Sequence, residues 1–196
     1  MIIIFCSSQQ TEEFKYVKAY YNQHRSMLGS EFKKKFDAET DASDKEAVKQ
    51  DFLLFMKKMD SIENVALIGA LLKVKNLEDL GRIKSVGNPD KNSEPNTPPD
   101  QSADYPGGID TLREEVANLF YKEGVYSEVK TVKANVIFTV EKDGRISNVH
   151  AQGDNFTFNR QAEIALYSVS EKFSPAIYKG YAIQSRFNLP LIMQKE

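Results

Sequence analysis

Apolar residues recur every three or four positions through the first part of this chain, which is the period of a helix. Between residues 11 and 84 this spacing predicts five helices. The third has a possible capping box, in which Ser43 and Glu46 would each satisfy a free N–H at the helix start. We expect the breaks between helices at Gly29-Ser30, before Ser43, at Asp60-Ser61 and before Asn76.

The last part of the chain mixes helical and alternating patterns in the order α-β-β-α-β. Alternation from Val132 to Val140 predicts a strand, and a second strand follows from Ile146 to Ala151. Helices are expected on either side of this pair, the first opening at Pro106-Gly107-Gly108 and ending at Gly124, and the second capped by Asn159. The turn between the strands is expected at Asp143-Gly144.

The final stretch, Tyr181 to Ile192, alternates apolar odd positions with mostly polar even ones until Pro190. Because proline has no N–H to give a neighbouring strand, this strand is expected at a sheet edge, where a partner peptide can add a strand. Arg186 would point away from the apolar side. It could pair with an acidic residue of a bound peptide, or discourage aggregation at the edge.

Residues 87–103 separate these two patterns. They hold four prolines among Asn, Asp and Ser, a composition that cannot bury a core and is typical of an extended linker. We therefore expect an α+β chain with an all-helical domain over residues 11–86, a Pro-rich linker over 87–103 and a small domain with an antiparallel sheet over 104–196.

Composition narrows the class of partner. The chain has 196 residues, of which 41% are hydrophobic and 28% charged, with a formal net charge of −2. Residues 1–100 hold 15 Lys and Arg against 16 Asp and Glu, and the remainder holds 11 against 12. This balance argues against nucleic acid as a partner. No run approaches the ~20 apolar residues of a membrane-spanning helix, so the chain as given is not expected to be a transmembrane protein.

Cys6 is the single cysteine, and it follows an apolar run, Met1 to Phe5. An apolar run that ends at a cysteine and changes to Ser and Gln resembles the end of a bacterial lipoprotein signal, in which Cys6 would be lipidated and residues 1–10 would be the remnant. The alternative is a short N-terminus with an inert thiol. Both interpretations stay open.

No set of residues suits catalysis or a metal, so we expect a protein that is not an enzyme and has no cofactor. Cys6, His24 and His150 are far apart in sequence and do not have a metal-ligand spacing. Tyr16 and Tyr20 lie off the apolar stripe of the first helix. They are therefore candidates for contact with another molecule.

Four motifs in the last part of the chain resemble the C-terminal domain of TonB proteins, over about residues 105–193. They are an opening motif, a hairpin, a motif after the second helix and a motif in the last strand. In order, these are Tyr105-Pro106-Gly107-Gly108, Val136 to Val149 through Asp143-Gly144, Phe173-Ser174-Pro175-Ala176, and Arg186-Phe187-Asn188-Leu189-Pro190.

The resemblance implies a periplasmic protein of a Gram-negative cell envelope. Its last strand would pair with an extended segment, the TonB box, of an outer-membrane transporter and support energised nutrient uptake. Carried over by position, the partner-binding residues are Ile183, Gln184, Ser185, Arg186, Phe187, Asn188 and Leu189.

The chain departs from the family pattern in its helical region, and it lacks the family's membrane helix and long spacer. This leaves an alternative function. The protein could be an envelope scaffold without energy transduction, forming a homodimer through its C-terminal edge strand.

Overall fold

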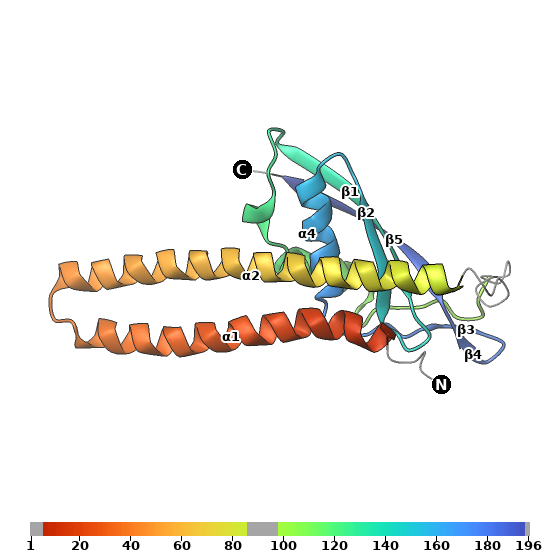
Figure 1. Cartoon of the computed structure of the whole chain (residues 1–196), viewed down its shortest axis with the longest axis horizontal. Coiled ribbons are helices and arrows are strands. Elements are labelled where there is room, and N and C mark those ends of the chain that lie inside the picture. The colour runs from red at the N-terminus through yellow and green to blue at the C-terminus, as the bar shows by residue number, and fades with distance from the viewer. Residues whose placement is uncertain (1–5, 86–97, 195–196) are drawn as a thin grey trace.

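The computed structural model describes residues 6–85 and 98–194, with side chains from residue 12 to 83 in the first segment. Within these ranges the chain is α+β (Figure 1). Two long helices form a hairpin, and shorter helices and a small antiparallel sheet follow. The expected fold class is confirmed.

The hairpin consists of α1 (Cys6–Ala38) and α2 (Ala42–Ser85). The prediction of five helices was therefore wrong, because Gly29, Asp60-Ser61 and Asn76 all lie inside helices. A glycine inside a helix costs only about 1 kcal/mol relative to alanine, which packing along a long helix pair readily offsets.

The turn between the two helices is capped by Asp41 rather than by Ser43. The Asp41 carboxylate accepts hydrogen bonds from the backbone N–H of Ser43, at 2.7 Å, and of Asp44, at 3.3 Å. Both donors are free at a helix start, so Asp41 satisfies two of them at once. The expected capping box at Ser43 and Glu46 is replaced by this single residue.

The remaining elements are α3 (Gly108–Leu119), the short 3-10 helix η1 (Lys122–Gly124), β1 (Thr131–Val140), β2 (Ile146–Gln152), α4 (Phe156–Tyr167), β3 (Ala176–Tyr178), β4 (Tyr181–Ile183) and β5 (Ser185–Gln194). The sheet has the strand order β2-β1-β5, and β3 pairs with β4 as a separate hairpin.

Three boundaries differ from those expected. Helix α3 ends at Leu119, before Gly124. Asn155, not Asn159, caps α4, because its side chain accepts a hydrogen bond from Phe158 N at 2.8 Å. The single final strand is divided at Gln184 into β4 and β5, which pair with different strands.

The hairpin and the sheet share one hydrophobic core. Helix α4 covers one face of β1 and β2. The open end of the hairpin, where α1 begins and α2 ends, packs against α4 and β2 (Figure 1). The Phe14 ring stacks on that of Tyr167, with 5.2 Å between centroids, and both side chains are fully buried. Leu71 and Val74 of α2 belong to the same cluster as Phe138 of β1.

The described end of the expected linker, residues 98–103, lies against the sheet region. Gln101 forms an antiparallel bridge with Ile177, and Ala103 is buried. Residues 87–97 of that linker, like residues 1–5 of the expected signal remnant, lie outside the described residues.

Candidate functional site

Strand β5 is an edge strand of the three-stranded sheet. It pairs antiparallel with β1 over ten residue pairs, from Val140 with Ser185 to Thr131 with Gln194. Among the described residues, no strand pairs with its other side. The edge position that Pro190 predicted is therefore present.

Pro190 also determines which backbone groups face this open edge. In an antiparallel pair, residues that exchange two hydrogen bonds alternate with residues that exchange none. Pro190 lies opposite Asn135 and has no N–H, so this is a pair without hydrogen bonds. Arg186, Asn188 and Ile192 lie an even number of residues from Pro190, so they also form pairs without hydrogen bonds to β1. Their N–H and C=O groups therefore point away from β1, toward the open edge.

The side chains of β5 alternate with the pattern expected from sequence. Leu189 is fully buried, and Phe187 stacks on Phe138 with 5.4 Å between ring centroids. Arg186 and Asn188 are exposed on the face of the sheet away from α4. Backbone and side chains of β5 are thus held in a fixed register by the core while the edge stays open.

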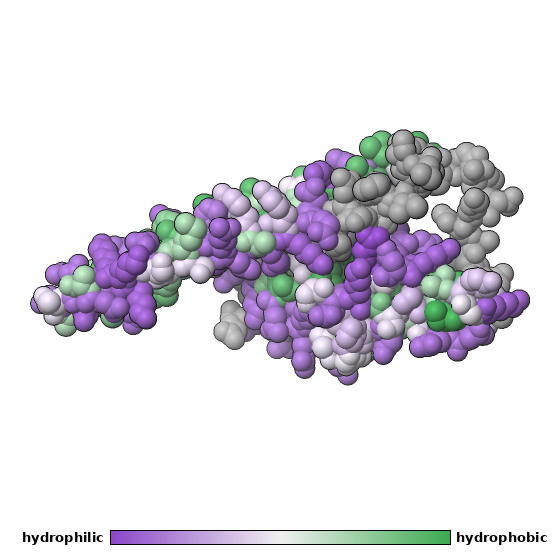
Figure 2. Space-filling model, turned by 90° about the horizontal axis from the view of Figure 1, so that it is seen from below, coloured by the Kyte–Doolittle hydropathy of each residue, from purple (hydrophilic) through white to green (hydrophobic). Residues whose placement is uncertain are grey.

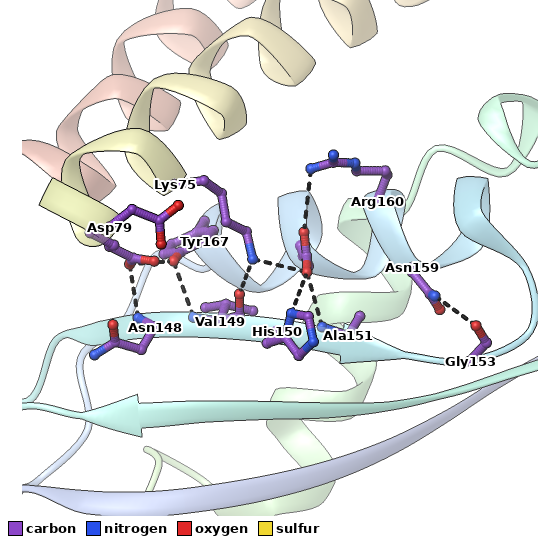
Figure 3. A network of polar contacts seen from close by, with 12 residues as sticks. Lys75, Asp79, Asn148, Val149, His150, Ala151, Gly153, Asn159, Arg160 and Tyr167 are labelled. Carbon is purple, nitrogen blue, oxygen red and sulfur yellow. Dashed lines mark hydrogen bonds and ion pairs between the residues drawn. The ribbon is translucent and has the colours of Figure 1, made fainter. Parts of the chain in front are cut away.

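The opposite edge of the sheet, along β2, is closed by side chains from two helices (Figure 3). The backbone N–H of Asn148 donates to Glu78 Oε1 at 2.8 Å, that of Val149 to the Tyr167 hydroxyl at 3.1 Å, and that of Ala151 to Glu163 Oε1 at 3.0 Å. Lys75 Nζ donates to the Val149 carbonyl. These groups are the ones that an added strand would need.

Charge is balanced within this closed edge. Glu163 is 5% exposed and lies 3.0 Å from Lys75 Nζ. Glu78 accepts from the Tyr167 hydroxyl at 2.6 Å. Burial raises the pKa of Glu78, although its hydrogen bonds from Tyr167 and Asn148 oppose the shift. The two edges of the sheet therefore differ: side chains of α2 and α4 occupy the β2 edge, whereas none of the described residues pairs with the β5 edge.

A groove of about 230 Å³ lies beside the second half of β5. Val116 and Ala117 of α3 form one wall together with Phe120, and Leu191 to Gln194 of β5 form the other. Arg113 and Lys122 contribute positive charge to its lining. The groove can take an apolar side chain of a segment lying along β5.

The expected opening motif forms the turn before α3. Tyr105 is 2% exposed, packs edge-to-face on Phe173 and donates to Glu115 at 2.5 Å. Burial and the Glu115 carboxylate raise the pKa of its hydroxyl. Gly107 and Gly108 have φ angles of 79° and 84°, which favour glycine, and Pro106 is exposed. The motif thus anchors α3 to the core.

The first three expected binding residues lie at the start of the edge or beyond it. Ile183 pairs with Ala176 in the β3–β4 hairpin, and the Gln184 side chain donates to Glu141. Ser185 lies opposite Val140. Because it is an odd number of residues from Pro190, its N–H points toward β1 and not toward the open edge. The open edge instead extends past Leu189 to Ile192, which the sequence did not single out.

The remaining candidates do not come together as a site. Cys6 is the first residue of α1. His24 Nδ1 lies 2.8 Å from the Tyr20 carbonyl within α1, and His150 Nδ1 lies 3.8 Å from Glu163. Over residues 6–85 and 98–194, no group of three or more His, Cys, Asp and Glu side chains is placed to hold a metal ion.

None of the helices in the described ranges has the length and hydrophobicity needed to cross a membrane. In comparisons with known proteins, neither a protein-family model nor a curated protein matches this chain. The open β5 edge and the groove beside it are therefore the candidate site on which a function can be argued.

Proposed function

We propose that this protein is a TonB-like binding protein of the Gram-negative periplasm that captures an extended peptide by strand addition to β5. The peptide would be the TonB box of an outer-membrane transporter, and binding would support nutrient uptake. The observation that carries the proposal is the contrast between an open β5 edge and a closed β2 edge.

The open edge offers a defined set of groups to a peptide. Arg186, Asn188 and Ile192 present N–H and C=O groups, and Pro190 presents a C=O alone. Each added hydrogen bond contributes about 0.5–1.5 kcal/mol net, so a peptide needs several of them. Backbone pairing reads little sequence, so the groove lined by Val116, Phe120 and Leu191 would supply side-chain specificity.

The resemblance implies two activities, peptide binding and energy transduction, and the structure gives less support to energy transduction. The hairpin of α1 and α2 has no counterpart in the family pattern, and it packs into the same core as the sheet. If Cys6 were lipidated, the anchor would enter one leaflet only. Peptide binding is therefore the activity proposed here, and coupling to a membrane motor is not required for it.

Asn188→Pro tests the proposal. It removes the N–H of Asn188, which points away from β1. Pro190 already occupies an equivalent position two residues later, so the pairing with β1 is kept. Asn188→Ala is the matched control, because it truncates the same side chain and keeps the N–H. Affinity for synthetic TonB-box peptides of outer-membrane transporters can be measured by calorimetry.

We expect Asn188→Pro to weaken binding about 3- to 10-fold, the loss of one net hydrogen bond, and Asn188→Ala to leave it near that of the unaltered protein. If the unaltered protein binds none of these peptides, or if the proline variant binds as well as the alanine variant, the proposal fails.

An envelope scaffold is the second candidate, favoured by the outer part of the hairpin, which projects well beyond the sheet (Figure 1). In this function β5 would pair with β5 of a second copy. Sedimentation separates the two candidates, since a dimer that Asn188→Pro dissociates in the absence of peptide favours the scaffold.

A further inference from the structure

Helix α2 carries two apolar stripes. The first faces α1 and α4 and is buried, and it includes Met59, Leu67, Leu71 and Val74. The second is exposed along about the last two-thirds of the helix. Its members and their exposed fractions are Phe55 39%, Ile62 55%, Val65 66%, Leu72 48%, Leu80 52% and Ile83 71%.

The spacing of the second stripe is regular. Phe55, Ile62 and Ile83 fall on one seven-residue series, which also contains Gly69 and Asn76, while Val65 and Leu72 fall on a second series. Apolar residues on two such series are typical of a helix that packs against another helix. At 100° per residue, the stripe is centred roughly 155° around α2 from its buried seam, on the flank away from Lys75, which contacts the sheet.

Helix α1 extends this surface. Tyr16, Tyr20 and Met27 are 71%, 47% and 59% exposed and share one side of α1. The ion pair of Glu13 with Lys73 crosses between the two helices on this side. Figure 2 shows hydrophobic residues at intervals along the upper margin of the hairpin, away from the rest of the molecule below it. We call these nine residues the outer face.

The outer face is large for a monomer. Its three aromatic side chains are about half exposed and present on the order of 100 Å² each, and the six smaller aliphatic ones present somewhat less, so the nine together present on the order of 700 Å². The largest apolar patch of a typical monomer is about 300–600 Å², and a standard stable interface buries about 800 Å² on each partner. The area is therefore close to what a dimer of this chain would need.

The charges around this face fit a protein partner better than a membrane surface. Over residues 6–85 the hairpin has 14 Lys and Arg and 13 Asp and Glu. Helices that lie on membranes are rich in Lys and Arg on their polar face. We infer that a second copy of this chain covers the outer face, with the two α2 helices packed antiparallel about a twofold axis.

Gly69 supports this register. It lies midway between Phe55 and Ile83, so an antiparallel pair would cross Gly69 to Gly69 and place Phe55 near Ile83 of the other copy. A Cβ added at Gly69 would have no neighbour within 4 Å in the single chain. Gly29 and Gly81 are equally uncrowded by the described residues, but of these helical glycines only Gly69 lies at the centre of the exposed stripe, where its missing side chain lets a second helix approach closely.

Charge selects the antiparallel direction. A parallel pair in register would place Lys58 opposite Lys58 and Asp79 opposite Asp79. In the antiparallel pair Lys58 instead lies within one residue of Asp79 of the other copy. Opposite charges across a helix pair stabilise it and like charges destabilise it.

Leu72→Glu in the whole chain tests the inference by sedimentation velocity over a concentration series. The matched control is Leu53→Glu, since Leu53 is 52% exposed on the same helix but lies off the exposed stripe, on the side of α2 that carries Leu71. We expect the unaltered protein and Leu53→Glu to form the same dimer. Leu72→Glu should raise the dissociation constant at least tenfold, because the dimer would bury two unpaired carboxylates.

Gly69→Cys tests the register in a Cys6→Ser background, with Leu53→Cys as its control. Under mild oxidation we expect a disulfide between copies at Gly69→Cys and none at Leu53→Cys. A dimer that does not crosslink at position 69 would overturn the antiparallel arrangement.

Two results would overturn the second copy as the occupant. One is a monomer at every concentration; if it binds phosphatidylglycerol vesicles, the outer face is a membrane surface. The other is a dimer that Asn188→Pro dissociates and Leu72→Glu does not, which would place the contact at β5. Peptide binding is measured separately, so its failure leaves this inference standing.

Discussion

Glu78 joins three elements through one carboxylate. It lies on α2, accepts from Tyr167 of α4 and accepts from the backbone of Asn148 of β2. Glu78 is 8% exposed, and burial raises the pKa of its carboxyl. Both hydrogen bonds and the nearby charge of Lys75 lower that pKa but do not cancel the effect of burial. A buried carboxyl thus lies where the hairpin, α4 and the edge of the sheet meet.

Glu78→Gln should change how stability depends on pH. Because the folded-state pKa is raised, folding favours the protonated carboxyl. The contribution of the protonated Glu78 carboxyl to the free energy of unfolding is fully present below the pKa that this group has in the unfolded chain. It is lost as pH rises through the pKa of the folded state. Glutamine keeps an oxygen acceptor for Tyr167 and Asn148 without the charge. The free energy of unfolding of the unaltered protein, minus that of Glu78→Gln, should therefore fall as pH rises.

Urea unfolding between about pH 4 and pH 8 measures this difference. A difference that stays constant over the range, or that grows with pH, would contradict the burial of Glu78 as its cause.

The turn between β1 and β2 is fixed by contact with a distant segment. Gly144 has a φ of 79°, and its carbonyl accepts a hydrogen bond from Phe173 N at 2.9 Å. A Cβ added at Gly144 would lie 1.9 Å from the Phe173 carbonyl oxygen. This glycine is required both by backbone conformation and by close approach.

Gly144→Ala should therefore destabilise the protein more than Gly180→Ala. Gly180 also has a φ of 79°, but its added Cβ would meet nothing within 4 Å. We expect about 1 kcal/mol for Gly180→Ala, from backbone strain alone, and roughly 2–4 kcal/mol for Gly144→Ala, where the segment at Phe173 must also move. Chemical denaturation of both variants measures the difference, and equal losses would exclude the contact as its source.

The strands were predictable because their signals are local. Alternation from Val132 to Val140, the turn at Asp143-Gly144 and the edge position of Pro190 can all be read within a few residues. The helices were not. Gly29 and Asp60-Ser61 are weak breakers, and what overrides them is packing between α1 and α2, such as Phe32 against Phe52 at 4.9 Å between ring centroids.

The candidate site was predictable only in part, for the same reason. Pro190 marked the open edge, but the closed edge depends on contacts of Lys75 and Glu78 with residues more than 60 positions later in the chain. The outer face had a partial signal, since Tyr16 and Tyr20 lie off the buried stripe of α1. Its larger share on α2 was hidden by the expected breaks at Asp60-Ser61 and Asn76.

The molecule as a whole is held together by one core that crosses from the hairpin to the sheet. Leu71 of α2 is fully buried in the cluster that also contains Tyr167 of α4 and Val136 of β1. A hairpin that contributes to this core should unfold together with the sheet, because removing either exposes apolar surface of the other.

Leu71→Ala tests that coupling, and Leu53→Ala is its control. Leu71 is fully buried, so its truncation should cost about 2–5 kcal/mol, whereas Leu53 is 52% exposed, so its truncation should cost under about 0.5 kcal/mol. In native-state hydrogen exchange, Leu71→Ala should lower the protection of β1 amides such as that of Val136 by as much as it lowers the protection of α2. Loss confined to α1 and α2 would mean that the sheet folds without the hairpin, and β5 would then present its open edge whether or not the hairpin is in place.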